Sequence, residues 1–268
     1  MLKDITLGQY FPGNSVIHRL DPRTKLLSLL VYIVLLFVAG GPVSYGLLFA
    51  VLVTCIAISK IPGKAFIRGM KPLLFILIFT ALLNLLFTQG EQVIISFWVI
   101  TITWEGAIRS IYMLARIVML ISCTFLLTYT TSPIALTDGL ESLLNPLKKI
   151  KVPVHELSMM MCIALRFIPT LIEETDKIMS AQKARGADFE TGKLKDRVKA
   201  LVPILVPLFI SAFRRADELA TAMECRCYHG GQGRTKMKLL RYKRRDLQTF
   251  ALLGILLVGT IVLKQLGL

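Results

Sequence analysis

Charged residues are scarce in this 268-residue chain. They make up 18% of it, against 54% hydrophobic residues, and the mean hydropathy is +0.65. This balance excludes an ordinary soluble domain, in which about a quarter of the residues are charged, and it also excludes intrinsic disorder. The five cysteines are too few and too scattered for a disulfide scaffold. The composition therefore predicts an integral helical membrane protein, all-α in fold class.

Groups that carry chemistry are also missing. No G-x-x-x-x-G-K-[ST] phosphate loop occurs, so a function driven by ATP needs another chain. The predicted membrane spans offer Asn84, hydroxyls and arginines, and lack the acids and histidines that acid–base or metal chemistry needs. Cys225-x-Cys227-x-His229 has no fourth ligand nearby, so it does not make a structural zinc site. We expect a protein that is not an enzyme and that holds no metal or cofactor of its own.

Long apolar runs are what the chain has instead. Residues 26–59 carry no charge, and Gly40-Gly41-Pro42 divides them into two helices joined by a tight turn. The first helix is short for a span of ~20 residues, so we expect it to begin on the Thr24 side or to lie in a thinned bilayer. Further runs at about 72–88, 105–129 and 247–263 bring the prediction to about five transmembrane helices. Residues 93–104 alternate like a strand at the membrane interface.

Two arginines interrupt the fourth run. Arg109 and Arg116 are seven residues apart and so lie on nearly one face of the predicted helix, which should not meet lipid. Because the spans offer no acidic partners, we expect these arginines to meet backbone carbonyls, Asn84 or headgroups, and not to line a pore.

The charges in the loops predict the orientation. The connection that holds Lys60, Lys64, Arg68 and Lys71 has no acid, whereas residues 90–105 hold only Glu91 and Glu105 as charges. The positive-inside rule makes the first connection cytoplasmic and the second external, with the N-terminus inside and the C-terminus outside. The basic run 234–245 could suggest nucleic acid, but contact with anionic lipid at the cytoplasmic face explains it more simply, and we expect no nucleic-acid partner.

Residues 132–246 differ from the rest, since they hold 21 basic and 13 acidic residues and no run as long as a clean span. We expect a cytoplasmic coupling part of about three helices, at 133–149, 154–184 and 193–225, two of them long and crossing. Apolar residues recur every three to four positions in the long helices, which predicts amphipathic helices along the membrane surface. The chain then divides into a transmembrane part at 1–131, the coupling part at 132–246 and a last transmembrane helix in 247–268.

A repeat marks the ends of the two long helices. Residues 176–185 and 217–226 share the pattern D-x-x-x-[ST]-A-x-x-x-R, 41 residues apart. Asp and Arg nine apart lie about 180° from each other on a helix, so they cannot pair and the arginine is free to contact something else. In a simpler interpretation each arginine only complements the helix dipole, with Gly186 and Gly230 as helix-ending residues. Repetition favours a partner that itself has two equivalent sites.

The motifs resemble those of a known family, the transmembrane T component, EcfT or CbiQ type, of energy-coupling factor (ECF) vitamin and metal transporters. Ala184-Arg185-Gly186 is similar to that family's first Ala-Arg-Gly signature, and Glu224-Cys225-Arg226 falls where the second lies. The second motif departs from the pattern, because Glu224 and Cys225 precede the arginine and Cys227 follows it, so Arg226 alone carries over firmly. The stretches His18-Arg19-Leu20-Asp21-Pro22-Arg23-Thr24-Lys25 and Arg166-Phe167-Ile168-Pro169 also resemble the family, and the likeness covers nearly the whole chain.

The resemblance implies a coupling scaffold of an ABC importer in a bacterial cell membrane. Two ABC-type ATPases, which bind ATP and Mg, would take the two arginine motifs on the cytoplasmic side, and a membrane-embedded substrate-binding S component would lie beside the scaffold. The unequal neighbours of the two arginines suit non-identical ATPases. Residues expected to face the S component or to lie where the long helices cross are Arg166, Pro169, Leu205 and Phe209.

Two other interpretations compete with this one. A conventional ABC importer permease would bind the substrate itself, and it would come with a soluble binding protein in place of an S component. A polytopic membrane enzyme would need catalytic groups that the spans lack. In the family that the chain resembles, the S component sets which vitamin or metal ion is transported.

Overall fold

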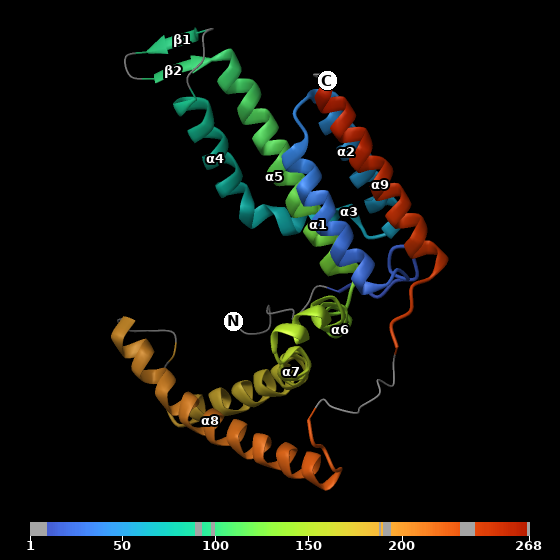
Figure 1. The fold of residues 1–268 in the computed structure, drawn as a ribbon. Coiled ribbons are helices and arrows are strands. Elements are labelled where there is room, and N and C mark those ends of the chain that lie inside the picture. The colour runs from blue at the N-terminus through green and yellow to red at the C-terminus, as the bar shows by residue number, and fades with distance from the viewer. Residues whose placement is uncertain are drawn as a thin grey trace. The chain divides into compact units, whose positions relative to one another are not determined.

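The computed structural model describes residues 10–88, 93–97, 100–187, 189, 194–230 and 239–266, with the backbone alone for 93–97, 100–102 and 194–200. The predicted all-α membrane fold is confirmed (Figure 1). The elements are α1 Pro22–Val38, α2 Pro42–Ser59, α3 Gly63–Met70, the 3-10 turn η2 Lys71–Leu73, α4 Leu74–Phe87, β1 Val93–Phe97, β2 Ile100–Thr103, α5 Trp104–Thr130, α6 Pro133–Leu144, the 3-10 turn η3 Asn145–Ile150, α7 Val154–Ala184, α8 Leu194–Cys225 and α9 Arg244–Gln265.

Five stretches among the described residues are long and apolar enough to cross a membrane: Pro42–Ser59, Gly63–Phe87, Trp104–Thr130, Val154–Ala184 and Arg244–Gln265. The number equals the prediction, but the membership differs. Helix α1 has 17 residues, which at 1.5 Å per residue gives about 25 Å, short of a ~30 Å hydrocarbon core. Helix α7, which we expected along the membrane surface, meets the length and composition of a span.

The first helix begins on the Thr24 side, as expected. Asp21 is its N-cap, and the Asp21 carboxylate accepts a hydrogen bond from the backbone N–H of Arg23 at 2.9 Å. Pro22 occupies the first turn, where its missing N–H costs nothing. The helix ends at Val38, and Pro42 starts α2 after the glycine pair.

Contacts divide the described chain into two compact units: one holds the described residues of 140–239, and the other those of 8–139 and 240–268. The boundary falls inside α6, whereas the sequence placed it at residue 132. In the second unit α1 packs against α5 and α9, and α2 packs against α5 (Figure 1).

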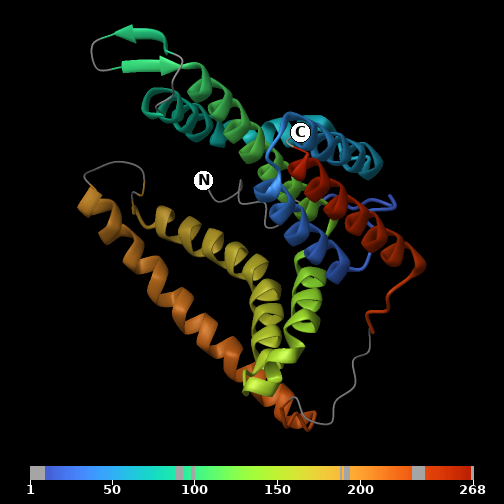
Figure 2. The ribbon, with the colours of Figure 1, turned by 45° about the horizontal axis from the view of Figure 1, so that its top comes forward.

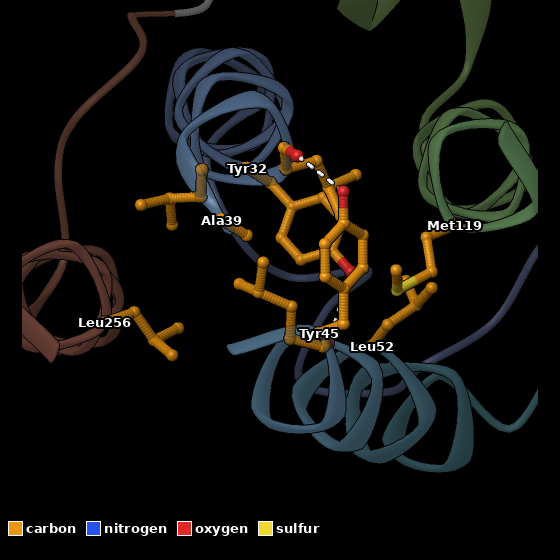
Figure 3. Close-up of a cluster of buried hydrophobic side chains, with 9 residues drawn as sticks. Tyr32, Ala39, Tyr45, Leu52, Met119 and Leu256 are labelled. Carbon is orange, nitrogen blue, oxygen red and sulfur yellow. Dashed lines mark hydrogen bonds between the residues drawn. The ribbon is translucent and has the colours of Figure 1, made fainter. Parts of the chain in front are cut away.

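A buried cluster holds that unit together (Figure 3). Tyr32 of α1 lies among leucines of α1 and α2, and its hydroxyl donates to the carbonyl of Leu48 at 3.1 Å. The Tyr45 hydroxyl donates back to the carbonyl of Leu36 at 3.4 Å. Both phenols thus meet a backbone acceptor on the neighbouring helix, which satisfies polar groups that burial would otherwise penalise.

The unit is tied at its other end by buried charged side chains. The Lys25 ammonium donates to the Thr130 carbonyl at 2.9 Å, to the Thr131 hydroxyl at 3.1 Å and to the His18 carbonyl at 3.3 Å. Asp246, 1% exposed, accepts from the backbone N–H of Asp21 at 2.9 Å and of Lys243 at 2.7 Å. These bonds join the start of α1 to the end of α5 and to the start of α9.

Two short segments lie outside the regular α-helices, and one of them was expected to resemble a strand. The segment that alternates in sequence forms an antiparallel pair, β1 with β2, in which Phe97 lies opposite Ile100. The helix predicted at 133–149 stops at Leu144 and continues as a 3-10 turn. Pro146 lacks an N–H for an α-helical bond and disfavours helical geometry at Asn145, so the α-helix ends there.

Helices α7 and α8 dominate the other unit and pack against each other (Figure 2). Their bounds agree with the prediction to within one residue. Pro169 lies inside α7, and Pro203 and Pro207 lie inside α8. Figure 2 shows α7 as a bent ribbon, as expected for a helix with an internal proline.

Candidate functional site

Helix α7 ends in a defined hydrogen-bonded turn at the first arginine motif. Arg185 is the C-cap, and Gly186 follows with φ +87°, in the left-handed region that favours glycine. The Gly186 N–H donates to the Lys183 carbonyl at 3.0 Å, and the Ala187 N–H donates to the Gln182 carbonyl at 3.0 Å. This pair of bonds is the Schellman motif, which satisfies the last free carbonyls of a helix.

Helix α8 ends in the same turn at the second motif. Arg226 follows the last helical residue, Cys225, just as Arg185 follows Ala184. The Cys227 N–H donates to the Glu224 carbonyl at 2.8 Å, and the Tyr228 N–H donates to the Met223 carbonyl at 3.0 Å. The two arginines therefore occupy one structural position at the ends of two helices.

The two arginine motifs differ in the residue that follows the arginine. Cys227 takes the left-handed conformation with φ +54°, at the position that glycine fills in the first motif. A side chain there costs on the order of 1–2 kcal/mol. Gly230, which we had considered as the helix-ending residue, lies five residues beyond the end of α8, so Cys227 takes that role.

The spacing that the two copies of the repeat share also has a structural meaning on both helices. The Ser180 hydroxyl donates to the carbonyl of Asp176 at 2.7 Å, and the Thr221 hydroxyl donates to the carbonyl of Asp217 at 2.9 Å. Each hydroxyl thus bonds the carbonyl four residues back, at the same place in the last turns. The two repeats therefore share side-chain hydrogen bonds as well as residue types.

Both arginine motifs are exposed. Ala184, Arg185 and Gly186 are all exposed, and so are Glu224, Cys225 and Arg226. Among the described residues, neither the Arg185 nor the Arg226 guanidinium has a hydrogen bond or an ion pair. An unpaired arginine on an ordered helix end is available to a carboxylate or a carbonyl of another protein.

A pair that the sequence analysis did not single out joins α7 to α8. Arg215 donates a hydrogen bond to the Glu174 carboxylate, which also has a side-chain hydrogen bond with Ser211. The two residues are 41 positions apart, which is the offset of the repeat. That offset, combined with opposite charges at equivalent positions, is the signal that could have identified the pair.

Arg166 and Pro169 are exposed on α7. Within the described part of the chain, Arg166 makes no hydrogen bond or ion pair, and Glu174 makes polar contacts between the two long helices with Arg215 and Ser211.

Helix α8 carries an uncovered apolar stripe. Leu205 is 47% exposed and Phe209 is 62% exposed, whereas Ile204 is buried. Their neighbours at helical spacing are exposed too: Leu201, Val202, Val206, Ile210 and Phe213. Such a stripe marks a surface that meets lipid or another apolar protein.

The two arginines of α5 have different surroundings. Arg116 donates to the Tyr45 hydroxyl, at 2.9 Å from its Nε, and lies 5.2 Å over the ring of Phe37. Its hydrogen-bond partner within the chain is therefore a tyrosine of α2, and neither a backbone carbonyl nor Asn84. Arg109 is exposed. Asn84 bonds the Thr80 carbonyl and the Met113 sulfur instead.

All five cysteines are free thiols. Cys55 and Cys123 are partly buried in the unit of α1, α2, α5 and α9, whereas Cys225 and Cys227 are exposed. The described residues contain no group of three His, Cys, Asp or Glu side chains that could hold a metal ion.

Comparison with known proteins gives consistent results. The family model for CbiQ, described as cobalt transport protein, matches residues 13–237. A protein of Acidaminococcus fermentans called energy-coupling factor transporter transmembrane protein EcfT is 54% identical over 264 residues, which cover 98% of this chain and 96% of the relative. Proteins of the same name are 54% identical in Thermosediminibacter oceani, over 97% of this chain and 98% of the relative, and 48% identical in Bacillus subtilis, over 96% and 97%.

Proposed function

This chain belongs to the EcfT/CbiQ family and is a transmembrane T component of an energy-coupling factor transporter, and from that premise we propose that it couples two ABC-type ATPases to a substrate-binding S component. It is a membrane protein and is not itself catalytic. ATP and Mg bind to the ATPases, and the chain transmits the motion of those subunits. The observation that carries the proposal is the repeated helix end that presents Arg185 and Arg226 in one geometry.

Each arginine inserts into a groove of one ATPase and meets carboxylate or carbonyl acceptors there. Two equivalent anchors suit a partner with two related subunits. Truncation of an arginine that is buried in a groove typically costs ~2 kcal/mol or more of binding free energy. The neighbours of the anchors differ. Gly186 leaves the first motif narrow, whereas Glu224, Cys227 and the half-buried Tyr228 surround the second, which supports two non-identical ATPases.

The apolar stripe of α8, with Leu205 and Phe209 at its centre, takes the S component. When the ATPases close, α7 and α8 move relative to each other and the stripe carries that motion into the membrane. The S component determines whether a vitamin or a metal ion is transported. The arginine motifs and the N-terminus lie on the cytoplasmic side of the bacterial membrane, as the loop charges support.

The test is a pull-down of the ATPases and substrate uptake in membrane vesicles for Arg185→Glu, Arg226→Glu and the double variant. Because one anchor keeps the second ATPase at a high effective concentration, each single variant should retain some assembly but transport poorly. The double variant should lose the ATPases. Arg214→Glu is the matched control, since it reverses an exposed arginine on α8 outside both motifs.

Uptake at the wild-type level by the double variant would reject the coupling role and leave the arginines as helix-end charges. Two further variants, Leu205→Asp and Phe209→Asp, should reduce S-component association and leave ATPase association unchanged. Purification with native partners separates the T component from a conventional permease: a small apolar membrane subunit should be present in the complex, and a soluble binding protein should be absent.

A further inference from the structure

An apolar cavity of about 140 Å³ lies between α1, α2, α5 and α9. Its walls are mostly aliphatic and aromatic, and include Leu29, Tyr32, Leu52, Leu126, Leu253 and Leu256. Apolar walls of this kind favour an apolar ligand, such as a segment of a hydrocarbon chain.

The few polar groups in the wall are already bonded within the protein. The Lys25 ammonium is held by Thr130, Thr131 and His18, and the Tyr32 hydroxyl by the Leu48 carbonyl. The hydroxyls of Ser28, Thr130 and Thr249 each donate to a carbonyl four residues back. No wall donor among these is free to hold a polar ligand, so the cavity fits a hydrocarbon chain.

A basic pocket lies at the start of α9. It is lined by four exposed cations: Arg19, Lys243, Arg244 and Arg245. The nearest acid on the helix, Asp246, points into the protein, where both of its oxygens accept backbone N–H groups. Among the residues that the structure describes, none of the four cations has an acidic partner, so this pocket attracts an anion.

The two features have no lining residue in common, but both lie on α9 and on the segment before α1. Arg245, Thr249, Leu252 and Leu256 are spaced by three or four residues and so lie on one face of α9, with the arginine at its start. On the other side, Arg19 lies between Ile17 and Leu20, which line the cavity. From Arg245 to Leu256 the helix rises about 16 Å, roughly half of a ~30 Å hydrocarbon core and hence the depth of one leaflet.

We propose that the cavity and the basic pocket together bind one anionic phospholipid, with its phosphate at Arg19, Arg244 and Arg245 and part of one acyl chain between α1, α2, α5 and α9. This goes beyond the general attraction of a basic flank to an acidic membrane, because it predicts one lipid per chain in a fixed pose. Inorganic phosphate should bind more weakly than this lipid, because it has no acyl chain to contact the cavity. Phosphatidylcholine should also bind more weakly, because the cation of its headgroup is repelled by the four cations of the pocket.

Native mass spectrometry of the purified transporter complex is the first measurement. With phosphatidylglycerol we expect each protein molecule to retain one lipid. The affinity for that lipid should fall at least 10-fold in the triple variant Arg19→Gln, Arg244→Gln, Arg245→Gln. The matched control Lys64→Gln, Arg68→Gln, Lys71→Gln removes the same charge from exposed positions and should bind like wild type. Phosphatidylcholine and inorganic phosphate should not displace the lipid. Equal losses in both triple variants would show a diffuse charge effect, and displacement by inorganic phosphate would show an anion site without lipid; either would overturn the proposal.

The position of the acyl chain can be tested with the wild-type protein. A phosphatidylglycerol that carries a photoreactive group in its acyl chain should label residues of the cavity wall, such as Leu52, Leu126 or Leu253. Labels confined to Ile255 and Val258, which are 74% and 60% exposed on α9, would place the chain outside the cavity and overturn the proposal.

Discussion

Arg215 of α8 donates a hydrogen bond to Glu174 of α7, and the two residues occupy equivalent positions of the 41-residue repeat. Equivalent positions of the two repeats therefore meet where α7 packs against α8. Glu173-Glu174 of α7 corresponds to Arg214-Arg215 of α8. The equivalent positions therefore carry opposite charges and attract each other.

Reversal of one charge at this crossing should impair coupling. Glu174→Arg places two cations together, and we expect uptake in vesicles to fall about 10-fold while the protein is still inserted. The double variant Glu174→Arg, Arg215→Glu restores an opposite pair and should recover most of the uptake. Because the pair is only partly buried, the interaction energy from the double-mutant cycle should be on the order of 1 kcal/mol.

Glu173→Arg is the control for that experiment, since it reverses an exposed neighbouring charge. An equal loss from Glu173→Arg, or no recovery in the double variant, would show that the local field or the fold is responsible, and not the pair.

The helix ends predict opposite responses to substitution. Gly186→Ala puts a side chain at φ +87°; no neighbouring atom would meet the new Cβ, so the cost is the backbone strain of ~1–2 kcal/mol. Cys227→Gly removes that strain and should stabilise the end of α8 by up to ~1 kcal/mol. Hydrogen exchange of the last-turn amides should become faster at Ala187 in the first variant and slower at Tyr228 in the second. Faster exchange at Tyr228 in Cys227→Gly would contradict the assigned turn.

Lys25 should be essential for the stability of the transmembrane unit. Lys25→Met keeps the length of the side chain but leaves the Thr130 and His18 carbonyls and the Thr131 hydroxyl without their donor. We expect a loss of ~1–3 kcal/mol, seen as a lower midpoint of thermal unfolding in detergent. Lys60→Met removes an exposed lysine and should leave the midpoint within error.

The position of α7 relative to the membrane has two possible outcomes, because its composition fits a span although it carries Arg166, Glu173, Glu174 and Asp176. Each charge at a bilayer centre costs roughly 2.5–3.5 kcal/mol, so we expect α7 to lie outside the membrane core. In a cysteine-free background, Val152→Cys and Ala187→Cys should both react with an impermeant thiol reagent from the cytoplasmic side. Reaction from opposite sides would make α7 a transmembrane helix.

Local sequence determined most of the helices. The Gly40-Gly41-Pro42 break, the start of α1 on the Thr24 side and the bounds of α7 and α8 follow from backbone chemistry within a few residues, and the structure agrees with each. The repeat also located two exposed arginines at helix ends, because spacing on a helix fixes which residues can pair. The predicted helix 133–149 is wrong in its last turns, although its cause is also local, because Pro146 ends the α-helix and a 3-10 turn follows.

Tertiary structure decided the contacts between distant residues. Asp21 and Asp246 are 225 positions apart, Lys25 and Thr130 are 105 apart, and Arg116 reaches Tyr45 across 71. No local pattern marks such pairs, because each depends on which helices pack together and at what height. Burial then selects the partner: an ion or hydroxyl removed from water must find a donor or acceptor, and only the packed helices determine which one lies within reach.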